Sequence, residues 1–300
     1  TNEYEEQSVS GENRSIESSN SAITNQEKNR RYALSLATLA SKPLKRLQIV
    51  QDGAIGILIE LATHHDKLIQ VRCASAFASL SAEPSIRPRM LDEGALGVLI
   101  SLATNSNIRE IKADCAKAIC NLCCVSGYEF KMVKEGVPFA MLNIAAACPE
   151  TLDICLKTLL NISCIPDKFA RIEDVTESLL YFVNHNSLTV SQEQTMIAAL
   201  CNLSALRNNQ LRLVEDGCLR IVEKYYKSKY DALRKMVCEM LKNFTSESRA
   251  RAKLLDIDII SVIVVMSQDS LEEIRILSAK CLYFLSKDRN FRRKIVHSTA

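Results

Sequence analysis

The stretch Ile119-Cys120-Asn121-Leu122-Cys123 decides the fold, because its pattern recurs three more times along the chain. The further copies are Leu159-Leu160-Asn161-Ile162-Ser163, Leu200-Cys201-Asn202-Leu203-Ser204 and Leu241-Lys242-Asn243-Phe244-Thr245. The intervals between the four asparagines are 40, 41 and 41 residues. The same step leads back to Ser79 and Thr38, and forward to Phe284. A period of this length predicts an array of stacked structural repeats.

Apolar residues keep a fixed spacing around the asparagine position in every copy. Two residues before it stand Leu36, Phe77, Ile119, Leu159, Leu200, Leu241 and Leu282. One residue after it stand Leu39, Leu80, Leu122, Ile162, Leu203, Phe244 and Leu285. Five residues before it stand Ala33, Ala74, Ala116, Leu156, Ile197, Cys238 and Ala279. At about 100° per residue these columns form one apolar stripe on a helix, and the asparagine points nearly opposite that stripe. We therefore expect the asparagines on the face that this helix does not bury in its own repeat.

Glycine turns form a second landmark, upstream of each such helix. They occur in Asp52-Gly53-Ala54-Ile55, Glu93-Gly94-Ala95-Leu96, Glu135-Gly136-Val137-Pro138 and Asp216-Gly217-Cys218-Leu219. Glycine suits a helix end because it adopts a positive φ at little cost. The register predicts two more turns, near Thr176 and Asp258, where the glycine has been lost.

Short basic and apolar segments precede the turns, and apolar runs follow them. The preceding segments are Arg89-Met90-Leu91, Lys131-Met132-Val133, Arg171-Ile172, Arg212-Leu213-Val214 and Lys253-Leu254-Leu255. Each unit is therefore predicted to contain a short helix, a turn, a medium helix, a loop and a long helix. The stretch Ile259–Val265 has strand-like composition. Its register matches the medium helix of the other units, so we predict a helix there.

The composition is that of a globular intracellular chain. Of the 300 residues 47% are hydrophobic and 24% are charged, and a net charge of +3 is too small to indicate nucleic acid or an anionic membrane as the partner. The chain opens on Thr1-Asn2-Glu3-Tyr4, with no signal segment, and its longest apolar run, Ile259 to Met266, is too short to span a bilayer. Twelve cysteines in such a chain indicate reduced thiols. The expected location is the cytoplasm, with association with the cytoskeleton or a cilium left open, and with the nucleus as the alternative compartment.

The pattern divides the chain into four parts. Residues 1–24 are rich in Ser, Asn and Glu, carry five Glu against Arg14, and are expected to be a disordered acidic tail or linker. Residues 25–41 read as a partial repeat, 42–287 as six repeats, and 288–300 as the start of a further repeat. Because the chain stops inside a repeat, we expect it to be a fragment of a longer array.

Three helices per unit, the period near 41, the "Gly-Ala-Ile…Leu-Ile-x-Leu" turn and the "Leu-x-Asn-Leu-Ser" end together resemble the armadillo repeat. The resemblance covers about residues 25 to 300. It implies an all-α, right-handed armadillo-repeat superhelix, an α-solenoid whose third helices line a concave groove. In armadillo proteins such as importin-alpha and beta-catenin, asparagines in this column bond the backbone of an extended peptide. The resemblance carries that role over to Asn121, Asn161, Asn202 and Asn243.

The chain departs from importin-alpha at one column. There a Trp four residues before each groove asparagine helps to hold a basic peptide. The corresponding residues here are Leu34, Ser75, Lys117, Lys157, Ala198, Glu239 and Lys280. No aromatic ring is available for a cation–π contact, and Lys117 and Lys157 would repel a basic peptide.

Two alternatives stay open for the asparagines and two for the lysines. The asparagine amides either clamp a ligand backbone or cap the carbonyls at the end of their own helix. Lys117, Lys157, Lys235 and Lys280 either line a positive groove or are ordinary solvated side chains. In the first case the partner is a protein or peptide segment, and a positive groove would favour an acidic one. The residues that would hold it are Asn121, Asn161, Asn202, Asn243, Lys117, Lys157 and Lys280.

No catalytic, metal or cofactor site is predicted. Cys120, Cys123 and Cys124 lack the second cysteine pair or nearby histidine that a zinc site needs, so we expect them to fill the core. No Ser/His/Asp or Cys/His constellation follows from the register, and the chain has no phosphate-binding glycine loop. The predicted function is therefore that of a non-enzymatic scaffold or adaptor, with no nucleic acid and no direct membrane insertion. The alternatives are a nuclear-transport adaptor and the targeting arm of a larger enzyme, such as a U-box ubiquitin ligase.

Overall fold

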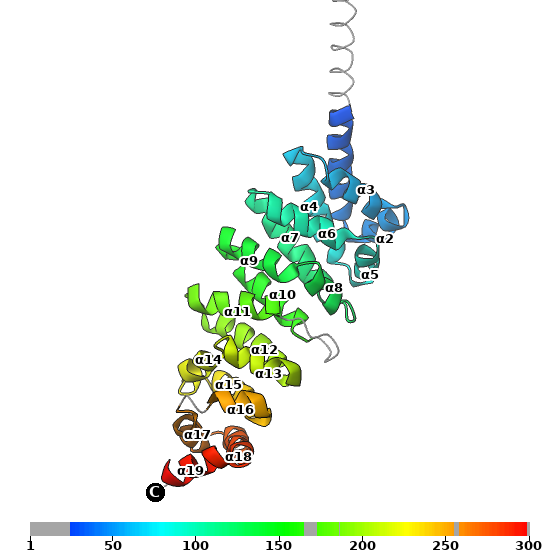
Figure 1. The fold of residues 1–300 in the computed structure, drawn as a ribbon. Helices are drawn as coiled ribbons and strands as arrows, with labels where there is room; N and C mark the ends of the chain where they lie inside the picture. Colours follow the sequence, from blue (N-terminus) through cyan, green and yellow to red (C-terminus); the bar gives the residue numbers. More distant parts are fainter. Residues whose placement is uncertain (1–24, 165–172, 186, 255–257, 299–300) are drawn as a thin grey trace, which may run out of the picture. The chain divides into compact units, whose positions relative to one another are not determined.

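The computed structural model describes residues 25–164, 173–185, 187–254 and 258–298, and all its regular elements are helices (Figure 1). No strand occurs within those ranges, so the predicted all-α class is confirmed for them. The chain divides into two compact units, residues 1–122 and 123–300. The expected disordered segment, residues 1–24, lies outside the described part.

The first unit begins its described part with a helix over residues 25–40. Its further helices are α2 (Pro43–Gln51), α3 (Ala54–Ala62), α4 (Lys67–Ser81), α5 (Arg87–Asp92), α6 (Ala95–Asn105) and α7 (Arg109–Leu122). The order of short, medium and long helices matches the prediction. The long helices α4 and α7 pack against each other.

The second unit continues the same order of helices. They are α8 (Glu129–Lys134), α9 (Val137–Ala147), α10 (Leu152–Ile162), α11 (Glu173–His185), α12 (Val190–Ala205), α13 (Arg207–Glu215), α14 (Leu219–Tyr225), α15 (Asp231–Ser246), α16 (Ser248–Leu254), α17 (Ile259–Ser267), α18 (Glu272–Ser286) and α19 (Arg289–Ser298). The long helices α10, α12, α15 and α18 pack in succession. The short helix expected around Arg171 and Ile172 falls outside the described residues.

A glycine precedes the medium helix in four places, directly before α3, α6 and α9 and two residues before the first residue of α14. Gly53, Gly94, Gly136 and Gly217 have φ between 89° and 93°, a region that costs other residues strain. The predicted turn at Asp258 is present directly before α17, which also confirms the helix over the strand-like stretch. The predicted turn near Thr176 is wrong, because Thr176 lies buried inside α11, which begins at Glu173. Of the two positions that lack the glycine, the register therefore places the turn correctly at Asp258 and wrongly at Thr176.

The predicted apolar stripe forms the core of both units. From Phe77 to Leu241 its members at positions −5, −2 and +1 are all buried. Near the two ends of the described part the burial weakens, since Leu36, Leu39 and Leu282 are half-buried and Ala279 is exposed. Ala33 and Leu285, which belong to the stripe near the same two ends, remain buried, so only part of the stripe loses its cover there.

We call one short, one medium and one long helix in succession a helix triplet. Polar contacts between successive triplets add to the contacts of the core. Arg234, which is 12% exposed, binds Asp269, which is 8% exposed, through two bonds, Nε to Oδ2 at 2.6 Å and Nη2 to Oδ1 at 3.0 Å. In the first unit, Gln26 and Arg30 reach Asp66, which also caps α4. Burial alone would raise the pKa of Asp66, but these hydrogen bonds outweigh it and hold that pKa at about 2. Each contact joins residues 35 to 40 positions apart in the chain.

Candidate binding face: an asparagine ladder between helix triplets

Four asparagines recur at the same position of the repeat, and we call them the ladder asparagines: Asn121, Asn161, Asn202 and Asn243. Each donates an amide N–H to a side chain at the end of the preceding long helix. In the first unit, Asn121 Nδ2 lies 3.1 Å from Ser81 Oγ. In the second unit, Asn202 Nδ2 lies 3.0 Å from Ser163 Oγ, and Asn243 Nδ2 lies 2.9 Å from Ser204 Oγ. For Asn161 the corresponding residue of the preceding triplet is Cys123 rather than a serine, and its amide contacts Cys124 Sγ at 3.5 Å. The four amides thus connect neighbouring triplets like rungs.

The orientation of these amides follows from the acceptor. Ser81 Oγ donates to the carbonyl of Ala78, Ser163 Oγ to Leu160 and Ser204 Oγ to Cys201. Because the single proton of each hydroxyl is already used in that bond, the hydroxyl oxygen can only accept a hydrogen bond from the asparagine. The amide nitrogen therefore faces the serine, and the reading in which each asparagine caps its own helix end is wrong.

The other half of each amide remains available. The Oδ1 atoms of the ladder asparagines accept no hydrogen bond from the described residues. They are also not among the solvent-excluded polar atoms without a partner, which within that part are only Ser178 Oγ and Asp216 Oδ2. Water or a ligand N–H can therefore reach them.

The asparagines are less exposed than the helical geometry of one triplet suggests. Asn121, Asn161 and Asn202 are half-buried, and Asn243 is only 7% exposed. The expectation that they avoid the buried stripe of their own triplet holds. The contact with the preceding triplet covers them instead, a contact that periodicity within one helix cannot reveal.

The predicted lysines fall into two groups. Lys117 is tied to Asp114 at 3.0 Å, and Lys235 is paired with Glu273. Lys157 and Lys280 are exposed and make no ion pair with the described residues. In the second unit they occupy the same helical column on α10 and α18, four residues before the ladder position. We call the surface formed by Asn161, Asn202, Asn243, Lys157 and Lys280 the ladder face.

Where another residue stands at the ladder position, as at Thr38 and Phe284, the side chain makes contacts within its own helix instead. The Thr38 hydroxyl donates to the carbonyl of Leu34 in its own helix. The Phe284 ring packs on Tyr283, with centroids 5.6 Å apart, and the ammonium group of Lys287 lies over both rings. The amide contact between neighbouring triplets is therefore made by Asn161, Asn202 and Asn243 in the second unit and by Asn121 in the first.

Sequence reasoning missed the acceptors of the ladder. The serines lie two residues after the ladder position, and Cys124 and Cys164 lie three residues after it. Asn202 Nδ2 also lies 3.4 Å from Cys164 Sγ, beside its bond to Ser163. The signal was present in the motif itself, because its fifth residue is a small polar one in two of the four copies and a threonine in another.

All twelve cysteines lie among the described residues, and none forms a disulfide bond. Cys73, Cys115 and Cys155 are buried as predicted, and burial raises the pKa of Cys73 and Cys115 to about 12. Cys123 also fills the core, but the core assignment is wrong for Cys124, which is exposed although both cysteines follow the end of α7 at Leu122. Within the described part no three His, Cys, Asp or Glu side chains are grouped so as to hold a metal ion.

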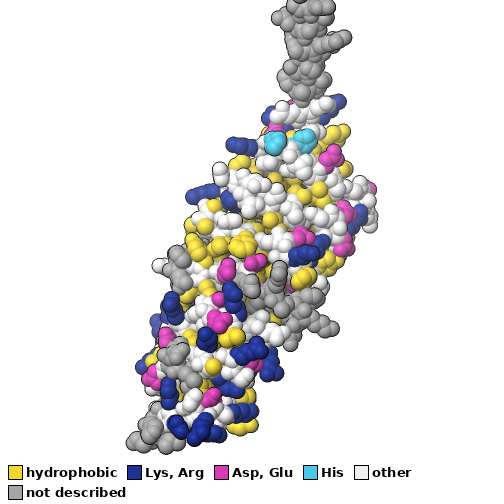
Figure 2. All heavy atoms as spheres, viewed as in Figure 1, with side chains coloured by type: hydrophobic (Ala, Val, Ile, Leu, Met, Phe, Trp, Pro, Cys, Tyr) yellow, Lys and Arg dark blue, Asp and Glu magenta, His cyan; other side chains and the backbone are white. Residues whose placement is uncertain are grey.

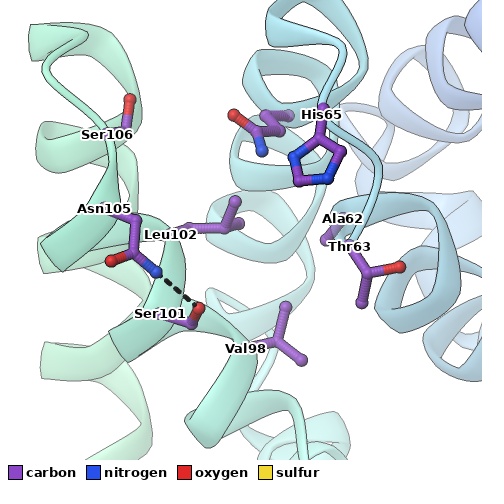
Figure 3. Close-up of a pocket in the computed structure, with 9 residues that line it drawn as sticks. Ala62, Thr63, His65, Val98, Ser101, Leu102, Asn105 and Ser106 are labelled. Atoms are coloured by element: carbon purple, nitrogen blue, oxygen red, sulfur yellow. Dashed lines mark hydrogen bonds between the residues drawn. The ribbon is translucent and has the colours of Figure 1, made fainter.

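One hollow lies away from the ladder, beside the loop between α3 and α4 (Figure 3). It has a volume of about 430 Å³ and is lined by Ala62, Thr63, His65, Gln70, Val98, Ser101, Leu102, Asn105 and Ser106. Asn105 donates to Ser101 at 3.1 Å, and Gln70 donates to the carbonyl of His64 at 2.9 Å. No carboxylate or second imidazole faces His65 across the hollow, so this lining provides no acid–base pair.

The surface carries mixed charge with one basic end. Figure 2 shows acidic and basic side chains interspersed over most of the visible face, and Lys and Arg gathered over the C-terminal helices. Arg289, Arg292, Arg293 and Lys294 of α19 are all exposed. Among the described residues, no helix has the length and apolar character needed to cross a bilayer.

Comparison with known proteins finds likeness at the level of fold alone. No family model matches the chain, and no curated protein sequence matches it either. One similar solved structure is an engineered protein, Northeast Structural Genomics Consortium target OR497, at 22% identity and a TM-score of 0.68, with 90% of this chain and 67% of that chain covered. Another is the engineered protein target OR366, at 18% identity and a TM-score of 0.59, with 78% and 99% covered. The chain therefore shares an all-α architecture with these engineered proteins.

Proposed function

We propose that the chain is an armadillo-type array, a right-handed α-solenoid of about six repeats, that binds an extended protein segment along its ladder face. The motif columns, the recurring order of three helices and the likeness to engineered all-α proteins support this reading. The function is that of a scaffold or adaptor without chemistry of its own.

One observation carries the proposal: the ladder asparagines hold their N–H groups inside the protein and leave Oδ1 accessible. An accessible row of amide oxygens, one per triplet, is suited to accept backbone N–H groups from an extended chain. Each such bond contributes about 0.5–1.5 kcal/mol net, so useful affinity requires several rungs together.

The charge of the partner follows from the lysines. Lys157 and Lys280 are exposed and without an ion pair among the described residues, whereas Glu239 between them is partly engaged by Cys201 Sγ at 3.4 Å. The ladder face therefore favours an acidic segment over a basic one. A nuclear-transport adaptor would need the opposite preference.

The test uses two synthetic peptides of equal length, one rich in Glu and one rich in Lys, each in a flexible Gly/Ser background. Fluorescence anisotropy should detect binding of the Glu-rich peptide, weakening as salt rises because exposed charges are screened. Lys157→Glu with Lys280→Glu should abolish it without changing the thermal melt. The matched control is Lys134→Glu on α8, which is exposed and off the ladder face. Preferential binding of the Lys-rich peptide would favour the transport reading and overturn this one.

A further inference from the structure

Burial sorts the twelve thiols into three classes. Eight are buried: Cys73, Cys115, Cys123, Cys148, Cys155, Cys218, Cys238 and Cys281. Cys120 and Cys201 are half-buried, and Cys124 and Cys164 are exposed. Thiol–disulfide exchange requires direct access of a thiolate to the disulfide, so exposure decides which of these cysteines can react.

The two exposed thiols occupy one repeated position. Cys124 and Cys164 each lie three residues after a ladder asparagine, just past the end of α7 and α10. Each sulfur is contacted by the amide of the next rung, Cys124 by Asn161 at 3.5 Å and Cys164 by Asn202 at 3.4 Å. The thiol of Cys201 instead donates to Glu239, and burial together with this carboxylate raises the pKa of Cys201 to about 12. Cys201 is thereby kept in the unreactive thiol form.

We propose that Cys124 and Cys164 form a paired modification site, which takes a mixed disulfide from an anionic low-molecular-weight disulfide of the glutathione type. The thiolate sulfur attacks one sulfur of that disulfide, the new S–S bond forms as the old one breaks, and the other half leaves as a thiolate. The preference for an anionic reagent comes from Lys157. It is exposed, carries no ion pair among the described residues, and lies one turn before Asn161, the residue that contacts Cys124.

The two positions differ in what modification does to the ladder. Among the described residues, Cys124 is the only hydrogen-bond partner of the Asn161 amide, whereas Asn202 keeps Ser163 Oγ at 3.0 Å beside Cys164. A mixed disulfide at Cys124 therefore disturbs its rung more than one at Cys164 does. A modified ladder face would also exclude an extended ligand, and this last consequence alone rests on the proposed function.

The experiment exposes the folded, fully reduced chain to glutathione disulfide and, in parallel, to the dicationic disulfide cystamine. Acid quenching and peptide mass spectrometry then give the rate at each cysteine. Cys124 and Cys164 should react at least about tenfold faster than the eight buried thiols, because only accessible thiolates attack. Glutathione disulfide should outpace cystamine at Cys124, and Lys157→Glu should reverse that order. Equal rates at exposed and buried thiols, or no reagent preference at Cys124, would overturn the proposal.

Two variants guard against an uninformative result. Cys124→Ser with Cys164→Ser keeps an acceptor for each asparagine, and its early uptake of label should fall by two groups per chain. Cys201→Ser, the matched control, should leave both reactive positions unchanged. Uptake by the double variant equal to that of the natural chain would refute the assignment. No ligand is present in these reactions, so they stand or fall independently of peptide binding.

Discussion

At the residue scale, each ladder asparagine uses the two ends of its side-chain amide in different ways. The N–H end bonds a serine or cysteine about 40 residues earlier in the chain, and the oxygen end remains accessible. An amide is the side chain best suited to this, because it carries donors and an acceptor on a short, two-torsion stem. Replacing it therefore changes stability as well as binding.

Asn243→Ala should lower the free energy of unfolding by about 1–3 kcal/mol, because it leaves a buried serine hydroxyl without its donor. Asn243 is chosen because it is the most buried rung, at 7% exposure. Urea unfolding followed by circular dichroism measures the change. Asn208→Ala on α13, where the side chain is exposed and makes no hydrogen bond with the described residues, should stay within about 0.5 kcal/mol of the natural chain. Equal effects of the two substitutions would show that the rung contributes nothing.

At the scale of the elements, ion pairs connect long helices to the loops of the next triplet. The pair of Arg234 on α15 and Asp269 before α18 is nearly enclosed, and its bonding is bidentate. Asp269 raises the pKa of Arg234, and Arg234 in turn lowers the pKa of Asp269. Both groups therefore remain charged throughout the physiological pH range, and the contact does not act as a pH switch.

Arg234→Ala should destabilise the second unit by about 3–5 kcal/mol, since it leaves the Asp269 carboxylate enclosed without its counter-charge. Arg234→Met combined with Asp269→Leu should recover most of that loss, because no uncompensated charge remains. The comparison is Arg31→Ala, which removes a surface pair with Glu27 whose side chains are 77% and 51% exposed and should cost less than about 1 kcal/mol. Denaturant titration of the four proteins gives the values. A double variant as unstable as Arg234→Ala would contradict this account.

At the scale of the whole molecule, stability is distributed rather than concentrated in one core. The residues at 1–122 and at 123–300 form separate compact units, and within each unit helices pack mainly on near neighbours in sequence. Chains built in this way unfold in segments, so one melting temperature does not describe them. Local defects should therefore have local effects.

Phe77→Ala and Phe244→Ala test this distribution, because each removes a fully buried ring from a different unit. Each should cost about 3–5 kcal/mol locally through lost burial and the cavity left behind. Hydrogen exchange with mass spectrometry should show faster exchange around α4 and α7 for the first variant and around α12, α15 and α18 for the second. If either substitution accelerated exchange evenly along the chain, the molecule would be one cooperative unit.

The sequence by itself determined the helical class, the order of helices and the buried stripe. These features depend on local periodicity, which places Phe77 or Leu241 on the apolar side of a helix whatever its neighbours are. The glycine turns were equally visible, because a positive φ is a local requirement. Of the two positions where the glycine was lost, the turn was predicted correctly at Asp258 and wrongly at Thr176.

Only the tertiary structure decided what the asparagines bond and which thiols are exposed. The acceptor of Asn243 is Ser204, and that of Asn161 is Cys124, each in the preceding triplet. Such a pairing depends on how one triplet is rotated against the next, a relation that spacing along a single helix does not encode. For the same reason Cys123 is buried while its neighbour Cys124 is exposed: adjacent positions at a helix end are separated by the packing of the neighbouring triplet, not by their chemistry.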